Sequence, residues 1–225
     1  MRDVARSATL GFQGLPKSES RPLGGVAKRG FDILGAVAGL VLLSPLFLMV
    51  AALVKLSDGG SVFFGHNRIG RNGRVFRCLK FRTMVPNGDE VLQAYLRDNP
   101  LARVEWEQTR KLKDDPRVTR TGTILRRLSL DELPQILNIL KGDMSIVGPR
   151  PVVRSELEMY GSAAPFYLKS RPGLTGLWQV NGRNDVSYDS RVAFDRQYVE
   201  NWSVLGDIRI ILKTVVVVCL LKGSY

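Results

Sequence analysis

The chain has 225 residues, of which 44% are hydrophobic and 24% are charged. This composition excludes a disordered protein and suffices for one domain of ordinary size. Lys and Arg number 33 against 21 Asp and Glu, which gives a net charge of +12. Such a surface favours polyanionic partners: nucleic acid, anionic lipid head groups or phosphorylated substrates. The two cysteines form no C-x-x-C pair and predict no disulfide framework, as is typical of a cytoplasmic protein.

Residues 1–27 contain several glycines and prolines and no sustained hydrophobic period, so we expect a mobile cytoplasmic leader. Residues 33–54 carry no charge, and as a helix these 22 residues would be about 33 Å long, enough to cross the hydrocarbon core of a membrane. Length alone therefore predicts a spanning helix.

Two features oppose a spanning helix. Ser44-Pro45 lies in the middle of the run, where proline removes a backbone hydrogen bond and kinks the helix. Both flanks are basic, which favours a cytoplasmic location for both ends. The flanking basic residues are Arg21, Lys28 and Arg29 upstream and Lys55, Arg68, Arg71, Arg74 and Arg77 downstream. We expect a re-entrant helix over residues 28–56 that enters one leaflet, breaks at Ser44-Pro45 and returns, with a kinked spanning helix as the alternative.

Residues 57–225 are predicted to form a cytoplasmic domain of the α+β class that is mainly helical. Asn72-Gly73 between two β-rich segments predicts a β-hairpin. Residues 174–182 predict a short extended piece. Helices are predicted at 86–112, 122–128, 132–141, 151–160, 187–201 and 203–221. The last of these is apolar towards its end, and it could pack into the core or lie in the membrane interface.

Asp131 and Glu132 adjoin near a predicted helix start and have a structural and a functional interpretation. In the structural one, Ser129 and Glu132 have the spacing of a capping box, and acidic residues suit the first turn of a helix. Pro134 weakens this frame and fits better if Asp131 is itself the cap. On residue patterns alone the structural interpretation is favoured.

The functional interpretation assigns each carboxylate a separate task. Neighbouring side chains on a helix diverge by about 100°, so Asp131 and Glu132 are not expected to share one target. One carboxylate could meet an electrophile while the other holds a metal. Arg126 and Arg127 lie just upstream and are expected to keep both carboxylates ionised.

Four further segments are candidates for binding. The prolines of Gly148-Pro149-Arg150-Pro151 present one arginine rigidly, which suits bidentate recognition of a phosphate. Lys80 and Arg82 lie on a predicted strand, Arg183 in a loop rich in hydrogen-bond donors, and Asp195 on a partly aromatic helix. The structural alternatives are a turn, a charged strand face, a solvated loop and a solvated helix face.

Five segments in order resemble the monotopic polyprenyl-phosphate phosphoglycosyl transferases, or bacterial sugar transferases. They are KRGFDILGAVAGLVLLSPLFL, GRVFRCLKFRTM, DPRVTRTGTILRRLSLDELPQILNILKGDMSIVGPRP, RPGLTGLWQVNGRN and FDRQYVENWS. The similarity runs from about residue 28 to the last predicted helix. It is nearest to the short enzymes that begin exopolysaccharide repeats with galactosyl or glucosyl phosphate.

The resemblance implies a reaction at the cytoplasmic face of the bacterial inner membrane. Asp131 would attack the sugar-bearing phosphate of a UDP-sugar, expel UMP and form a covalent phosphosugar intermediate, which undecaprenyl phosphate would then accept. Glu132 would bind Mg²⁺ and Arg150 a phosphate. Ser44-Pro45 would match the break of the family's re-entrant helix. The residues Lys80, Arg82, Arg126, Arg183 and Asp195 would contact substrate.

A second class of function is a membrane-tethered basic module that binds nucleic acid or anionic lipid without catalysis. The net charge and the apolar segment of this chain would suffice for that role. The sequence contains no zinc finger, no RNA-recognition signature and no basic region with heptads, so no nucleic-acid partner is expected. Carboxylates beside arginines favour the transferase, because a polyanion binder gains nothing from them.

Overall fold

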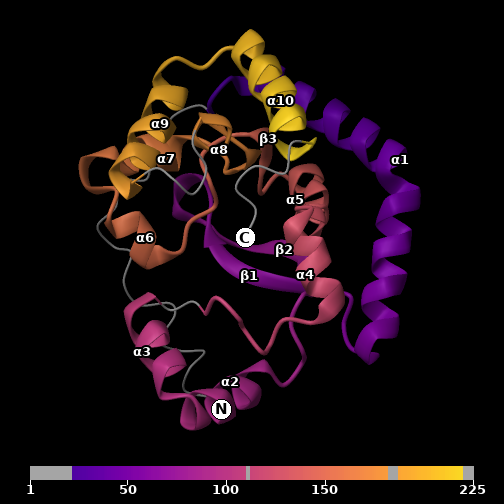
Figure 1. The fold of residues 1–225 in the computed structure, drawn as a ribbon. Helices are drawn as coiled ribbons and strands as arrows, with labels where there is room; N and C mark the ends of the chain where they lie inside the picture. The colour runs from indigo at the N-terminus through magenta and orange to yellow at the C-terminus, as the bar shows by residue number, and fades with distance from the viewer. Residues whose placement is uncertain (1–21, 110–111, 182–186, 220–225) are drawn as a thin grey trace.

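The computed structural model describes residues 22–109, 112–181 and 187–219 of the chain. Within these ranges the fold is mainly helical with two small sheets, which confirms the predicted α+β class. The helices are α1 (Gly25–Asp58), α2 (Gly88–Asp98), α3 (Pro100–Thr109), α4 (Arg120–Arg127), α5 (Gln135–Lys141), α6 (Arg154–Glu158), α7 (Ala164–Lys169), α8 (Leu177–Asn181), α9 (Tyr188–Glu200) and α10 (Val204–Cys219). The strands are β1 (Phe63–Ile69), β2 (Val75–Phe81), β3 (Ser145–Val147) and β4 (Gly173–Thr175). In Figure 1, α1 borders one side of the domain, and α6, α7 and α9 lie on the opposite side of the hairpin β1–β2.

The predicted hairpin is confirmed. Strands β1 and β2 pair antiparallel from Phe63 opposite Phe81 to Ile69 opposite Val75. Their connection contains Asn72 and Gly73 at φ 57° and 76°, a left-handed conformation that asparagine and glycine tolerate best. The hairpin places β2 beside α5.

A second strand pair was not predicted, because three-residue strands are too short to show a period of two. Strands β3 and β4 run parallel, with Ser145 opposite Gly173. A Cβ atom on Gly173 would collide with the backbone of Gly148, so both glycines allow the two segments to approach closely. The extended piece predicted over residues 174–182 is wrong beyond β4, where α8 begins. The helix predicted over 86–112 is divided into α2 and α3 at Pro100.

Helix α1 is continuous from Gly25 to Asp58 with Pro45 inside it, so Ser44-Pro45 does not interrupt the helix. Pro45 cannot donate to the carbonyl of Val41, but the hydroxyl of Ser44 donates a 2.8 Å hydrogen bond to that carbonyl instead. The acceptor is therefore satisfied and the helix proceeds past the proline. Figure 1 shows the helix curving around one side of the domain.

The two faces of α1 differ in their surroundings. The inner face packs on the domain along its length, with Ala36, Val50 and Val54 all at most 2% exposed. These residues belong to hydrophobic clusters that also contain Phe76 and Phe81 of the hairpin. The outer face exposes Leu34, Val37, Val41, Leu42, Leu48, Met49, Leu53 and Leu56. In the described part of the chain α1 is the one helix long and apolar enough to cross a membrane, and it is mostly exposed.

The N-terminal end of α1 is bound to the domain by polar contacts. Lys28 is buried and its Nζ donates a 2.7 Å hydrogen bond to Asp207 of α10. Arg29 donates bonds of 2.7 and 3.0 Å to the last carbonyls of α5. Asp32 accepts a 3.0 Å bond from the backbone of β3. Two of the basic residues that flank the apolar run therefore serve to hold α1 on the domain.

Helix α10 resolves the choice left open for the last predicted helix. One face packs inward through Asp207 and Ile210, and Thr214 exchanges a 2.7 Å hydrogen bond with Thr175 of β4. The other face is apolar and exposed, with Leu205, Ile208, Leu212, Val215 and Val216. The helix therefore contributes to the core and also presents an apolar surface, as interfacial amphipathic helices do.

Candidate active site

Asp131 and Glu132 lie in a single 3₁₀ turn, Leu130–Glu132, between α4 and α5. The Nζ of Lys80 reaches them from β2 and lies 3.2 Å from Asp131 Oδ2 and 2.7 Å from Glu132 Oε1. The expectation that the two carboxylates do not share a target is therefore wrong. They leave a tight turn rather than a regular α-helix, and the longer Glu132 side chain bends back to the same ammonium.

The capping box expected of Ser129 and Glu132 is also wrong. Ser129 makes no side-chain capping bond, and the residue before α5 is Pro134. The side chains of Asp131 and Glu132 face Lys80 instead of the free N–H groups of a helix. Ser129 has φ 56°, a left-handed conformation that is uncommon for a residue other than glycine. Strain of this kind concentrates at functional sites, so the turn is typical of an active site.

Burial dominates the electrostatics of Asp131, which is 7% exposed. Loss of solvent raises the pKa of the Asp131 carboxyl, while the charges of Lys80 and Arg126 oppose that rise. Arg126 acts in the direction expected of the upstream arginines, but burial has the larger effect on the pKa of Asp131. Burial alone would lower the pKa of Lys80, but Glu132 and Asp131 together raise it above its ordinary value. The carboxylates therefore stabilise the protonated lysine between them.

Arg126 is placed by a close approach of α4 to the end of β2. Its Nε donates a 2.9 Å hydrogen bond to Thr83 Oγ1. A Cβ on Gly122 would collide with the Thr83 carbonyl, so glycine is required where α4 crosses that segment. Gly122 was not predicted as a site residue, because the need for glycine comes from a contact 39 positions away along the chain.

Asn138 of α5 supports the strand that carries Lys80. Its Oδ1 accepts a 2.9 Å hydrogen bond from Leu79 N, and its Nδ2 donates a 2.8 Å bond to Arg77 O. A single amide thus takes the place of a third strand at the free edge of β2. Asn138 is 1% exposed and was not predicted, since it appears in the sequence as one polar residue in an apolar helix.

A second cluster surrounds Trp178 of α8. The guanidinium of Arg150 lies 5.6 Å from the ring centre of Trp178, and that of Arg191 lies 4.8 Å from it. Asp195 is 3% exposed and accepts a 2.7 Å hydrogen bond from the Tyr160 hydroxyl. Burial raises the pKa of Asp195 to about 7, although Tyr160 and Arg150 act to lower it. The alternative of a solvated helix face at Asp195 is wrong.

Charges from both clusters act on one thiol. Cys78 of β2 is buried, which raises the pKa of its thiol to about 11, and charges from Lys80, Glu132 and Arg150 all act on that thiol. The side chain of Arg82 lies against Gly60, just beyond the end of α1. Arg183 lies outside the described residues.

The paired carboxylates fit a divalent cation. Among the described residues no group of three or more His, Cys, Asp or Glu side chains converges as a metal site. Mg²⁺, however, is usually held by one or two carboxylates together with substrate phosphates and water. Asp131 and Glu132 already converge on one cationic group, the Lys80 ammonium, so their oxygens are placed for such binding.

Comparison with known proteins places the chain in a family. Residues 23–221 match the model of the family described as bacterial sugar transferase. The chain belongs to the bacterial sugar transferase family. The resemblance inferred from the sequence is thereby confirmed.

Three relatives illustrate the range of this family. The chain is 63% identical, over the full length of both proteins, to the exopolysaccharide production protein ExoY of Sinorhizobium fredii. It is 52% identical to the UDP-galactose-lipid carrier transferase of Erwinia amylovora, over 94% of this chain and 43% of that protein. It is also 52% identical to the undecaprenyl-phosphate galactose phosphotransferase of Salmonella typhimurium, again over 94% of this chain and 43% of that protein. The chain spans less than half of these last two relatives.

Proposed function

We propose that this chain transfers a sugar 1-phosphate from a UDP-sugar to undecaprenyl phosphate or a similar polyprenyl phosphate, as the first membrane step of exopolysaccharide synthesis. The proposal rests on one observation: Lys80 of β2 contacts both Asp131 and Glu132, which lie in a strained, half-buried turn. Family membership and the names of the relatives support the substrate classes.

The proposed reaction has two displacements at one phosphorus atom. In the first, an Asp131 oxygen attacks the β-phosphorus of the UDP-sugar, and the bond from that phosphorus to the α-phosphate oxygen breaks and releases UMP. In the second, a phosphate oxygen of the polyprenyl phosphate attacks the same phosphorus. The bond to Asp131 then breaks, the carboxylate is regenerated, and a polyprenyl diphosphate sugar leaves.

Burial prepares Asp131 for this role, because a carboxylate with a raised pKa is more basic and a better nucleophile than a solvated one. Lys80 holds both carboxylates in place and supplies positive charge where the phosphate oxygens would arrive. Mg²⁺ held by Glu132 and by the incoming phosphates would neutralise those oxygens and stabilise the leaving group.

The second cluster is proposed to bind the donor. Arg150 presents its guanidinium at the surface, as phosphate recognition requires. Within the described part of the chain, four buried side-chain atoms of α8 and α9 have no hydrogen-bond partner: Trp178 Nε1, Gln179 Oε1, Arg191 Nε and Asp195 Oδ1. Buried polar atoms are normally paired, so donors and acceptors left open together favour a ligand that offers both, such as a nucleotide sugar.

The membrane placement is proposed from α1. Contacts near both ends hold this helix on one domain, from the Lys28–Asp207 pair to the burial of Val54, while its outer face stays apolar. Because one domain packs against α1 along the whole helix, the two ends of α1 cannot lie on opposite sides of a bilayer. We therefore infer a non-spanning helix in one leaflet, with the catalytic turn at the cytoplasmic head-group level, where the charged lipid phosphate lies.

A labelling experiment on the purified full chain tests the proposal. With a UDP-sugar labelled in its β-phosphate, and with no acceptor, wild type should become covalently labelled and release one equivalent of UMP. Asp131→Asn keeps the size of the side chain but removes the nucleophile, so it should do neither. Addition of polyprenyl phosphate should discharge the label into lipid.

Asp114→Asn is the matched control, since Asp114 is exposed and lies away from the dyad in the sequence. It should behave as wild type, and circular dichroism should show that both variants are folded. Equal labelling of Asp131→Asn and wild type would refute the assignment. Absence of UMP release from wild type with every UDP-sugar would favour the non-catalytic basic module instead.

A further inference from the structure

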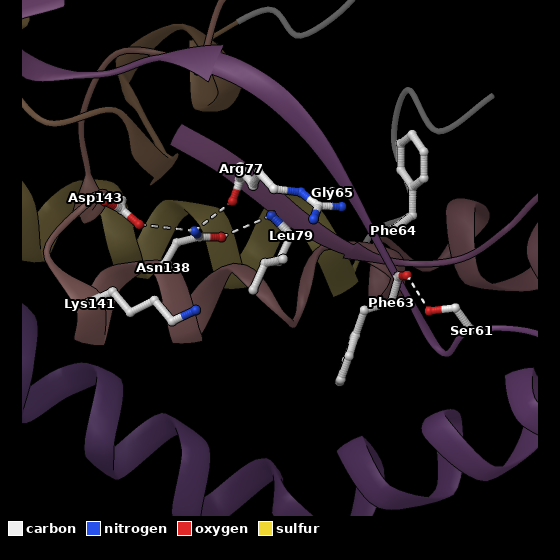
Figure 2. A pocket seen from close by; sticks show the side chains of 9 residues that line it. All are labelled: Ser61, Phe63, Phe64, Gly65, Arg77, Leu79, Asn138, Lys141 and Asp143. Atoms are coloured by element: carbon white, nitrogen blue, oxygen red, sulfur yellow. Dashed lines mark hydrogen bonds between the residues drawn. The ribbon is translucent and has the colours of Figure 1, made fainter. Parts of the chain in front are cut away.

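A cavity of ≈ 380 Å³ lies beside β2 and is lined by side chains from both strands of the hairpin and from α5 (Figure 2). Successive side chains of a strand point to opposite faces, so Arg77 and Leu79 line this cavity while Lys80 turns to the dyad. Its size is that of a small-molecule site. The lining residues are Ser61, Phe63, Phe64, Gly65, Arg77, Leu79, Asn138, Lys141 and Asp143.

The charges of the cavity are unbalanced towards the positive. Arg77 and Lys141 are both exposed, and within the described part of the chain the head group of neither forms an ion pair or hydrogen bond. A Cβ on Gly65 would lie 2.8 Å from Arg77 Nε, so glycine leaves room for the guanidinium across the strand. Asp143 is the one acid of the lining, and its Oδ2 is already 3.5 Å from Asn138 Nδ2.

The remaining wall is apolar and continues into the lipid-facing helix. Phe63 and Phe64 are 39% and 52% exposed. The ring of Phe63 lies 6.0 Å from that of Phe47 in α1 and 5.6 Å from that of Phe81. Figure 2 shows α1 passing beneath the cavity on the side where Phe63 points. The two cations therefore stand next to an apolar surface that continues to Phe47 of α1.

We propose that this cavity binds the phosphate of an anionic membrane lipid, held by Arg77 and Lys141, with the apolar chain leaving past Phe63 along α1. A free phosphate would gain nothing from the aromatic wall, and a nucleic acid would need a longer basic track. Arg77, one of the two proposed phosphate ligands, points to the other face of β2 from Lys80, so the phosphate site is separate from the dyad. Its occupant would fix the depth and orientation of the domain on the membrane.

Native mass spectrometry of the detergent-solubilised full chain can count the bound lipids. The probes are dioctanoyl phosphatidylglycerol and farnesyl phosphate, which share a phosphate on an apolar chain and represent the two sources of such a ligand. Wild type should bind one molecule at this site, and the tighter probe identifies the source. Arg77→Ala with Lys141→Ala should weaken binding about thirtyfold, since two cations near an anionic lipid are lost.

Arg74→Ala with Lys113→Ala removes the same charge from exposed positions outside the cavity and should leave binding within about twofold of wild type. Ser61→Trp keeps every charge but fills the rim, and it should also weaken binding. Equal losses in the control and cavity variants, or competition by inorganic phosphate at the concentration of the lipid, would overturn the proposal.

Discussion

Removal of the buried Lys28 charge should destabilise the protein strongly. Lys28→Met keeps the length of the side chain but leaves Asp207, 1% exposed, and Asp32, fully buried, without their cation. Breaking a buried ion pair costs about 3–5 kcal/mol. Asp207 keeps a 2.8 Å bond from Tyr198 and a 3.1 Å bond from Trp202, so the lower end of that range is expected.

A loss of about 3 kcal/mol should lower the melting temperature by roughly 6–12 °C in a chain of this size. Thermal unfolding of the full chain in detergent, followed by near-ultraviolet circular dichroism, measures the change. Lys55→Met is the control on the same helix, because Lys55 is exposed and should cost less than about 1 kcal/mol. Lys28→Met combined with Asp207→Asn should recover part of the loss. A fall of under about 2 °C for Lys28→Met would refute the assignment of α1 anchoring to this pair.

Three further predictions concern the site and α1. Burial raises the pKa of Asp195 to about 7, so its ionisation opposes folding, and the free energy of unfolding should fall as pH rises from about 4 to above 7. Asp195→Asn should flatten that pH dependence, as measured by chemical unfolding. Arg150→Lys keeps the charge but loses the planar fork, so UMP release should drop about tenfold or more. Contacts at both ends hold α1 on the domain, so Pro45→Ala should not change its topology. A single cysteine in the leader of this variant should stay unreactive to an impermeant label added outside intact cells. Labelling of the wild-type leader from outside would exclude the re-entrant arrangement.

Sequence patterns correctly predicted the elements whose structure depends mainly on residues close together in the sequence. The Asn72-Gly73 dipeptide located the hairpin, because few residues accept a left-handed conformation. The uncharged run located α1. The continuity of α1 at Ser44-Pro45 was not predictable from proline chemistry alone. It depends on whether the neighbouring serine hydroxyl donates to the carbonyl that proline leaves unpaired.

Contacts between distant segments were beyond the sequence patterns. Asp131 and Glu132 were identified as candidates, but nothing in their spacing showed that Lys80, about fifty positions earlier, would hold both. The pairing of Lys28 with Asp207 joins residues 179 positions apart. The site residues therefore remain predictions about role, while the structure supplies their arrangement.

The inner face of α1 has a consequence for how the protein is made. Ala36, Val50 and Val54 complete the same clusters as Phe76, Phe81 and the apolar side of α5, so the helix is a wall of the core and not a detachable anchor. A version that begins after the helix would expose that wall to water and should aggregate. During synthesis α1 leaves the ribosome well before its partners do. In the membrane arrangement proposed above, it would remain in the lipid until they arrive, and the domain would complete its folding at the membrane surface.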